Sequence, residues 1–179
     1  VQGRRVTLVS RLGAGGEGAV YLTDRDSVCK VYESTRLTST LQEKLELMIS
    51  KPINHTSVCW PQSLVTNAAG EFVGYLLPLA KGKELQRTVF IKPLLEQAFP
   101  NWWRLDLLSL AISIVKTINH LHDRQVLLGD INPLNILVES ATSVFFVDTD
   151  SYQIEDFPCP VGTATFLPPD LNGVDLGTV

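Results

Sequence analysis

The stretch Leu12-Gly13-Ala14-Gly15-Gly16-Glu17-Gly18-Ala19-Val20-Tyr21 decides the fold of this chain. Gly13, Gly15 and Gly18 follow the spacing G-x-G-x-x-G, which is weak evidence by itself because dinucleotide-binding turns share it. A dinucleotide site would continue into a helix, whereas residues 19–23 alternate in a way that predicts a strand. Because glycine lets the backbone approach phosphate oxygens closely, the stretch predicts a phosphate-covering loop between two strands. A flexible hairpin without a ligand is the alternative.

The composition of the chain bounds what it can be. It has 179 residues, 45% hydrophobic and 19% charged, which suits one domain or two small lobes. The net charge of -4 and the lack of a basic run argue against a nucleic-acid binder. Cys29, Cys59 and Cys159 show no metal-ligand spacing, which fits reduced thiols. Residues 105–121 are too polar to span a bilayer, so we expect a soluble, cytoplasmic protein without a membrane segment.

The N-terminal part predicts a small sheet with one helix. Residues 37–50 carry Leu41, Leu45 and Met48 at helical spacing and stop before Pro52. A turn is expected at residues 67–70, between the last two strands. The expected strands are residues 5–9, 19–23, 27–32, 64–66 and 72–77.

The C-terminal part is organised differently. Residues 102–122 carry two adjoining apolar stripes and predict a long helix that is buried over much of its circumference. Short strands are expected at residues 136–138 and 144–147. The boundary between the two parts is expected near residues 78–82.

Four further residues carry chemistry. Lys30 lies on a predicted strand and offers a positive charge to phosphates. Asp130 and Asn135 lie in the sequence Gly-Asp-Ile-Asn-Pro-Leu-Asn, and Asp148 ends an apolar strand. Carboxylate and amide oxygens are the ligands that hard cations such as Mg²⁺ prefer.

Together these motifs resemble the protein kinase superfamily, from the glycine stretch to the end of the activation segment. The resemblance implies an α+β, bilobal kinase-like fold that uses ATP and Mg²⁺. Residues 1–80 would form an N-lobe with a five-stranded antiparallel sheet. Residues 81–179 would form the N-terminal part of a truncated, mainly helical C-lobe.

The resemblance also implies roles for single residues in nucleotide binding. Gly13, Gly15, Gly18 and Val20 would cover the nucleotide, and Lys30 would hold its phosphates. Counting back from residues 82–85, Leu77 falls at the gatekeeper position, and Pro78 and Ala80 would face adenine through their backbone. These assignments place the nucleotide-binding residues on the glycine stretch, on the strand that carries Lys30, and on the hinge, residues 78–80.

In the C-terminal part, the resemblance implies that Asp130 orients the substrate hydroxyl and accepts its proton. Asn135 and Asp148 would bind metal ions. Thr163 lies in a stretch that resembles G-T-x-x-Y-x-A-P-E, closed by Asp170, and would contact Asp130. These are the expected catalytic and metal-binding residues.

A carboxylate on the helix at residues 37–50 is expected to orient Lys30. Glu43 and Glu46 are both within reach by count, and their spacing puts them on neighbouring parts of one helix face. We prefer Glu43, because glutamate-lysine followed by leucine resembles the family pattern there.

Several positions depart from the common kinase pattern. Leu128 and Gly129 stand where histidine and arginine are usual, so an activation-loop phosphate lacks its ordinary partner. Asn132 replaces a lysine near the transferred phosphate, and Asp150 replaces the glycine of D-F-G. These features resemble a bacterial kinase-like group associated with helix-hairpin-helix segments and tellurite-resistance systems.

Three functions are compatible with the sequence. The first is a Ser/Thr protein kinase acting on a protein substrate. The alternatives are a nucleotide-binding pseudokinase that regulates or scaffolds, and a small-molecule phosphotransferase. We also expect Leu108, Ile112, Val115 and the pair Phe145-Phe146 to be partly uncovered, and therefore to need a further C-terminal region, a partner or a second copy.

Overall fold

A computed structural model describes residues 4–159, 164–166, 169–171 and 174. The chain forms two compact units: unit 1 is Val1–Ile53 with Cys59–Leu79, and unit 2 is Asn54–Val58 with Ala80–Val179. The segment Asn54–Val58 thus packs with residues far from it in sequence. Within unit 2, the Phe146 amide donates a hydrogen bond to the Ser57 carbonyl at 2.7 Å. The composition of this segment gives no sign that it packs with unit 2.

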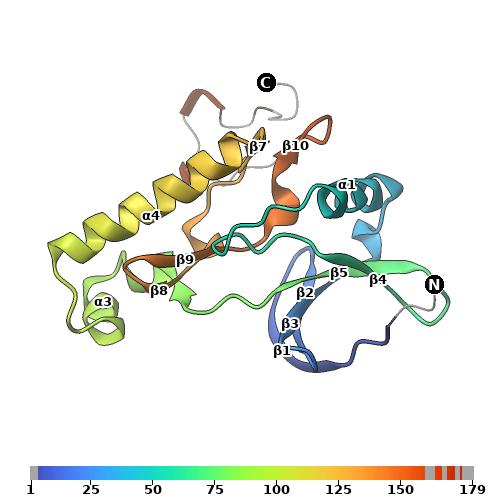
Figure 1. Cartoon of the computed structure of the whole chain (residues 1–179), viewed down its shortest axis with the longest axis horizontal. Helices are drawn as coiled ribbons and strands as arrows, with labels where there is room; N and C mark the ends of the chain where they lie inside the picture. The colour runs from blue at the N-terminus through green and yellow to red at the C-terminus, as the bar shows by residue number, and fades with distance from the viewer. Residues whose placement is uncertain (1–3, 160–163, 167–168, 172–173, 175–179) are drawn as a thin grey trace. The chain divides into compact units, whose positions relative to one another are not determined.

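Unit 1 is an antiparallel five-stranded sheet in the order β1-β2-β3-β5-β4, with α1 beside β4 (Figure 1). This confirms the α+β class and the five-stranded antiparallel sheet expected from the sequence. The elements of unit 1 are β1 Leu8–Gly15, β2 Gly18–Thr23, β3 Ser27–Tyr32, η1 Ser34–Arg36, α1 Ser39–Ser50, β4 Ser63–Thr66 and β5 Phe72–Pro78.

The first strand differs from expectation. Residues 5–9 were predicted, but β1 begins at Leu8 and continues through the glycines to Gly15, which pairs with Gly18. Only Gly16 and Glu17 form the turn. Glycine is a poor strand former on its own, and here cross-strand pairing with β2 overrides that preference. The glycine stretch is therefore the end of a β-hairpin rather than a long loop.

The helix α1 is fixed by its cap and by its apolar face. The Thr38 hydroxyl accepts a hydrogen bond from the Leu41 amide at 3.1 Å, which satisfies one of the amides left unpaired at a helix start. Leu45 and Met48 are fully buried. The Trp60 indole donates to the Met48 carbonyl at 2.8 Å and ties the C-terminal end of α1 to the segment before β4.

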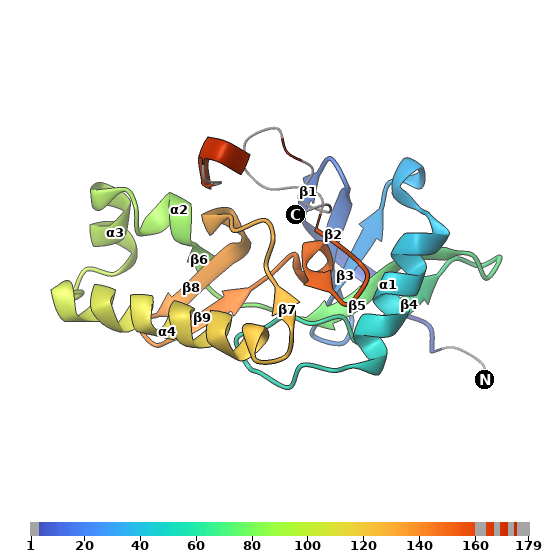
Figure 2. The ribbon, with the colours of Figure 1, turned by 90° about the horizontal axis from the view of Figure 1, so that it is seen from above.

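Unit 2 is built around the long helix α4, which packs against β7 and β9 (Figures 1 and 2). The strands form a three-stranded sheet, β6-β8-β9, and a two-stranded pair, β10-β7. The elements are β6 Lys83–Glu84, α2 Leu85–Thr88, α3 Lys92–Ala98, α4 Arg104–His122, β7 Val126–Leu127, η2 Pro133–Asn135, β8 Ile136–Ser140, β9 Ser143–Phe146, η3 Thr149–Ser151, β10 Gln153–Ile154, η4 Ala164–Phe166 and η5 Pro169–Leu171.

One side of α4 is apolar and exposed. Leu108, Ile112 and Val115 are 56%, 45% and 54% exposed, whereas Leu110 and Leu121 on the opposite side are buried. Exposure of these three residues agrees with the sequence expectation. Phe146, however, was expected to be partly uncovered and is fully buried, and Phe145 is half-buried. The side chain of Phe146 on β9 is thus covered, whereas the exposed strip of Leu108, Ile112 and Val115 lies on α4.

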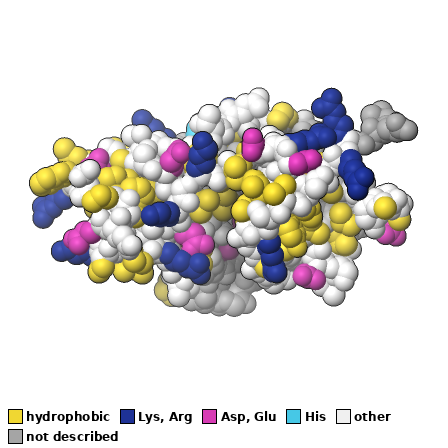
Figure 3. Space-filling view, turned by 90° about the horizontal axis from the view of Figure 1, so that it is seen from below, with side chains coloured by type: hydrophobic (Ala, Val, Ile, Leu, Met, Phe, Trp, Pro, Cys, Tyr) yellow, Lys and Arg dark blue, Asp and Glu magenta, His cyan; other side chains and the backbone are white. Residues whose placement is uncertain are grey.

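Among the described residues, no helix is long and apolar enough to cross a membrane. On the face drawn in Figure 3, Lys and Arg side chains are interspersed with Asp and Glu.

Candidate functional site

The predicted nucleotide-binding residues of unit 1 share one face of the sheet. Val20 is the cross-strand partner of both Gly13 and Lys30, and Val28 is the partner of Leu77. Directly opposite residues in an antiparallel pair point to the same side, as do residues two apart on one strand. The strand register therefore brings Val20, Lys30 and Leu77 to a single face, with Gly13 at its edge.

The glycines of the hairpin fall into two kinds. A Cβ on Gly18 would overlap the backbone of β3 at the Val31 carbonyl and Tyr32, so the strand packing itself requires glycine there. At Gly13, Gly15 and Gly16, a Cβ would meet no atom within 4 Å. Strand packing gives no reason for glycine at these three positions, and the open space beside them suits close approach of a ligand to the backbone.

Lys30 is a buried cation. Its side chain is 7% exposed, and its ammonium nitrogen lies 5.2 Å from the centre of the Tyr32 ring. A buried charge is costly unless it is paired. Here the Nζ atom lies 3.2 Å from Oε2 of Glu17, the residue at the tip of the hairpin.

This pairing differs from the one predicted. We expected Glu43, or else Glu46, to orient Lys30, but both side chains are exposed on α1, and Glu46 accepts a hydrogen bond from Gln42 at 2.9 Å. The buried side of α1 at this point carries Lys44 and Leu45 instead. The three-residue spacing puts Glu43 and Glu46 close together on a helix, but it does not determine which side of that helix faces the sheet.

The predicted hinge residues lie where the chain passes from unit 1 to unit 2. Leu77 is buried on β5, and Pro78 ends that strand opposite Ser27. Ala80 is the first residue of unit 2 in this part of the chain and is half-buried. Pro78 lacks an amide hydrogen, so its carbonyl is the group that it offers to a ligand.

In unit 2, the loop of Asp130 is held in a defined shape by asparagines. The Asn132 side chain accepts a hydrogen bond from the Leu134 amide at 2.9 Å and caps η2. The Asn135 amide donates to the Asn132 carbonyl, and the Asn135 carbonyl accepts from the Val147 amide, both at 2.9 Å. The last bond brings Asn135 beside the strand end that carries Asp148.

Asp148 has an unusual backbone. Its φ of 59° and ψ of 36° are left-handed, a conformation that non-glycine residues seldom adopt and that clusters at functional sites. The Ser151 hydroxyl donates to the Asp148 carbonyl at 2.8 Å, and the Ser151 amide donates to the same oxygen at 3.2 Å. The short helix η3 therefore holds Asp148 in this conformation.

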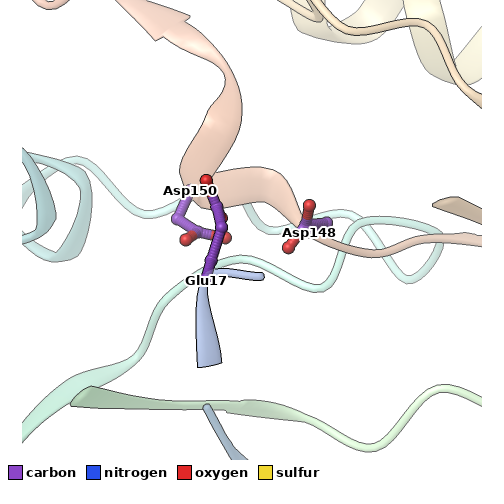
Figure 4. Close-up of side chains that lie close together, drawn as sticks. All are labelled: Glu17, Asp148 and Asp150. Atoms are coloured by element: carbon purple, nitrogen blue, oxygen red, sulfur yellow. The ribbon is translucent and has the colours of Figure 1, made fainter. Parts of the chain in front are cut away.

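Asp150 is a second carboxylate at the same place. It is 5% exposed, and one of its oxygens lies within 4.8 Å of an oxygen of Asp148. Figure 4 shows both side chains on the same segment of unit 2; Glu17, also labelled there, belongs to unit 1. With Asn135 nearby, the donor set is oxygen-only and fits Mg²⁺.

Gly129 precedes Asp130 and is required by the fold. Its φ is 59°, and a Cβ there would overlap both Sγ and Cβ of the buried Cys159. The side chain of Cys159 thus takes the space beside residue 129. This gives a physical reason for glycine at a position where the kinase pattern has arginine.

For the remaining predicted residues, the structure gives only their exposure or no description. Asp130 is half-buried, and Asp170 is exposed on η5. Thr163 lies outside the described residues. Sequence reasoning gave no site role to Glu17 or Asp150, although the glycine stretch and the Asp-x-Asp spacing contained both.

Comparison with known proteins points in one direction. No family model matches the chain. The chain is similar to protein kinase YegI of Escherichia coli strain K12, with 32% identity over 95% of this chain, and equally to protein kinase YegI of E. coli O157:H7. It spans 28% of the length of these relatives. Similarity over nearly the whole chain supports a kinase-like protein.

Proposed function

We propose that this chain is the ATP-dependent phosphotransfer part of a Ser/Thr protein kinase with a bilobal kinase fold, residues 1–80 forming the N-lobe and 81–179 part of the C-lobe. One observation carries the proposal: buried Lys30 shares a sheet face with Val20 and Leu77, next to a hairpin in which Gly13, Gly15 and Gly16 have open space beside them. The similarity to a named protein kinase agrees with it.

In this proposal, unit 1 binds the nucleotide. The backbone of Gly13, Gly15 and Gly18 covers the phosphates, and Lys30 neutralises part of their charge. Val20 and Leu77 supply apolar contact, and the backbone of Pro78 and Ala80 provides polar groups for adenine.

Unit 2 would carry the metal ligands and the base. Asn135 and Asp148 would hold Mg²⁺, which when bound neutralises charge on phosphate oxygens, and the position of Asp150 suits a further ligand. Asp130 would orient the substrate hydroxyl and accept its proton. Thr163 would position Asp130 through its hydroxyl.

A nucleotide-binding pseudokinase is the second candidate, and two observations favour it. The Asn132 side chain caps η2 and brings no positive charge to a transferred phosphate. Lys30 is paired with Glu17 instead of with a helix glutamate. Positioning and the remaining charges account for most of phosphoryl-transfer catalysis, so we expect a slower enzyme rather than an inactive one.

The proposal extends to the protein's group and surroundings. We place it with the bacterial helix-hairpin-helix and tellurite-resistance-associated kinases, acting in the cytoplasm on a protein substrate. The exposed strip Leu108, Ile112 and Val115 would be covered by a further region of the protein, a partner or a second copy.

Calorimetry with ATP, in the presence and absence of Mg²⁺, tests the proposal. Wild type should bind ATP more tightly with Mg²⁺, and Lys30→Met should weaken this binding. Lys116→Met, which removes an exposed lysine on α4, is the matched control and should bind as wild type does. Absence of ATP binding by folded protein would refute both the kinase and the nucleotide-binding pseudokinase.

A further inference from the structure

The Glu17 side chain bridges two cations within unit 1. Its Oε2 lies 3.2 Å from Lys30 Nζ, and its Oε1 lies 2.6 Å from a guanidinium nitrogen of Arg36. The two cations come from β3 and from η1, which begins two residues after β3 ends. One carboxylate therefore holds together a buried lysine and a partly exposed arginine.

We propose that Glu17 is a resident anion in a two-cation phosphate site, and that Arg36 is a phosphate-binding residue together with Lys30. A polyphosphate must displace the Glu17 carboxylate before it can bind both cations. The inference rests on the proposed nucleotide-binding function and adds to it a second cation and a built-in competitor.

The chemistry of the two cations supports this exchange. An arginine guanidinium binds carboxylate and phosphate with the same paired geometry, and lysine binds either as a point charge. A carboxylate that contacts both cations in the absence of nucleotide leaves them positioned for an anion with more oxygens and more charge. The Glu17 carboxylate therefore keeps the two cations in position, but it also competes with phosphate for them.

The Glu17 side chain can move away from the two cations without unfolding of the hairpin. Glu17 lies in the two-residue turn between β1 and β2, and its side chain is 41% exposed. The Glu33 amide donates to the Glu17 carbonyl at 3.0 Å, which anchors the backbone of the turn to the end of β3. Rotation of the Glu17 side chain toward solvent would break two ion pairs and no backbone hydrogen bond of the turn.

The expected size of the effect depends on how often the Glu17 carboxylate occupies the two cations. The Arg36 side chain is 53% exposed, so its pair with Glu17 is weak, while the pair with Lys30, at 7% exposure, is screened less. If the carboxylate occupies the cations in about nine molecules of ten, the apparent Kd for the nucleotide rises about tenfold. Removing the charge should therefore tighten binding by about three- to tenfold.

The test compares Glu17→Gln with Glu33→Gln by calorimetry, using ATP and inorganic tripolyphosphate as separate probes. Glu33 is exposed, lies close by and has the same charge, so its variant measures the general effect of removing a negative charge. We expect Glu17→Gln to bind both probes about three- to tenfold more tightly and Glu33→Gln to stay within about twofold of wild type. Arg36→Gln in the Glu17→Gln background should remove much of the gain.

The outcomes separate this inference from the proposed function. If wild type binds ATP and Glu17→Gln does not bind more tightly than Glu33→Gln, the inference is wrong and the function stands. If ATP fails to bind but tripolyphosphate binds Glu17→Gln more tightly, the phosphate site is supported and the nucleotide function is wrong. If neither probe binds any variant, both are wrong. Equal affinity of Glu17→Gln with and without Arg36→Gln would exclude Arg36 from the site.

Discussion

Replacing Gly129 by alanine tests why this chain lacks the arginine of the kinase pattern. Gly129 has a φ of 59°, and a Cβ at this position would overlap both Sγ and Cβ of Cys159. Cys159 is buried, at 2% exposure, so its side chain cannot move aside into solvent. Alanine therefore meets both an unfavourable backbone conformation and a steric overlap.

The two effects have separate magnitudes. A left-handed conformation costs a non-glycine residue about 1–2 kcal/mol. Forcing an extra methyl group into a packed interior costs about 1–3 kcal/mol. Gly129→Ala should therefore lower the free energy of unfolding by about 2–5 kcal/mol, a large fraction of the stability of an ordinary domain.

Urea denaturation of a double-mutant cycle measures the two effects. Cys159→Gly removes both overlapping atoms, so in that background Gly129→Ala should cost only the backbone term, about 1–2 kcal/mol. Cys159→Ala, which keeps the overlapping Cβ, is the matched control and should recover less. A Gly129→Ala protein as stable as wild type, or a penalty unchanged by Cys159→Gly, would refute the reasoning.

Three further predictions concern pH and regulation. Burial raises the pKa of the Cys29 thiol to about 11 and that of Cys59 to about 12, from 9.0. Stability from the neutral thiols is thus complete below pH 9 and lost as the pH rises toward 11, by up to about 1.4 kcal/mol per pH unit for each thiol. Urea denaturation from pH 8 to 11 should show this fall, and Cys29→Ala should make it shallower; an unchanged slope contradicts the assignment. The pKa of His120 is lowered, first by burial and then by Arg124, whose guanidinium lies 3.2 Å from Nδ1. Stability from neutral His120 is present above pH 6.5 and lost as the pH falls through the lowered pKa, so His120→Gln should flatten the acid side of a denaturation series; an identical acid profile would exclude His120 as its source. Thr165 is exposed, and glycine at position 129 provides no cation for an activation-loop phosphate, so Thr165→Ala should keep the phosphotransfer rate within a few-fold; loss of activity in a folded variant would show that the loop is regulated.

Much of the fold of unit 1 could be predicted from the sequence. Alternating residues located the strand β3 at Ser27–Tyr32 correctly, and helical spacing placed α1 within two residues at its start. The extent of β1 could not be predicted, because glycines form a strand there only through pairing with β2. The segment Asn54–Val58 belongs to unit 2 because of long-range contacts, which local sequence patterns do not encode.

For the candidate site, the sequence predicts which residues take part, and their roles remain predictions. Motif spacing predicts site roles for Lys30 and Asp148, and the structure shows a buried lysine and a left-handed aspartate at these positions. A partner for Lys30 was predicted on α1, whereas the structure shows an ion pair with Glu17 at the hairpin tip. Helix spacing alone cannot determine which side of α1 faces the sheet. In the sequence, Asp150 stood out only as a departure from the kinase pattern. Its burial beside Asp148 makes it a candidate metal ligand.

Transfer of labelled γ-phosphate from ATP by the full-length protein tests the central claim most directly. The assay would compare wild type with Asp130→Asn, which removes the proposed base and keeps the shape of the side chain. We predict that wild type transfers label to serine or threonine hydroxyls of a protein, and that Asp130→Asn binds ATP but loses the transfer. Equal labelling by the two proteins would contradict the assignment of Asp130, and ATP binding without any transfer by wild type would contradict the kinase and leave the pseudokinase.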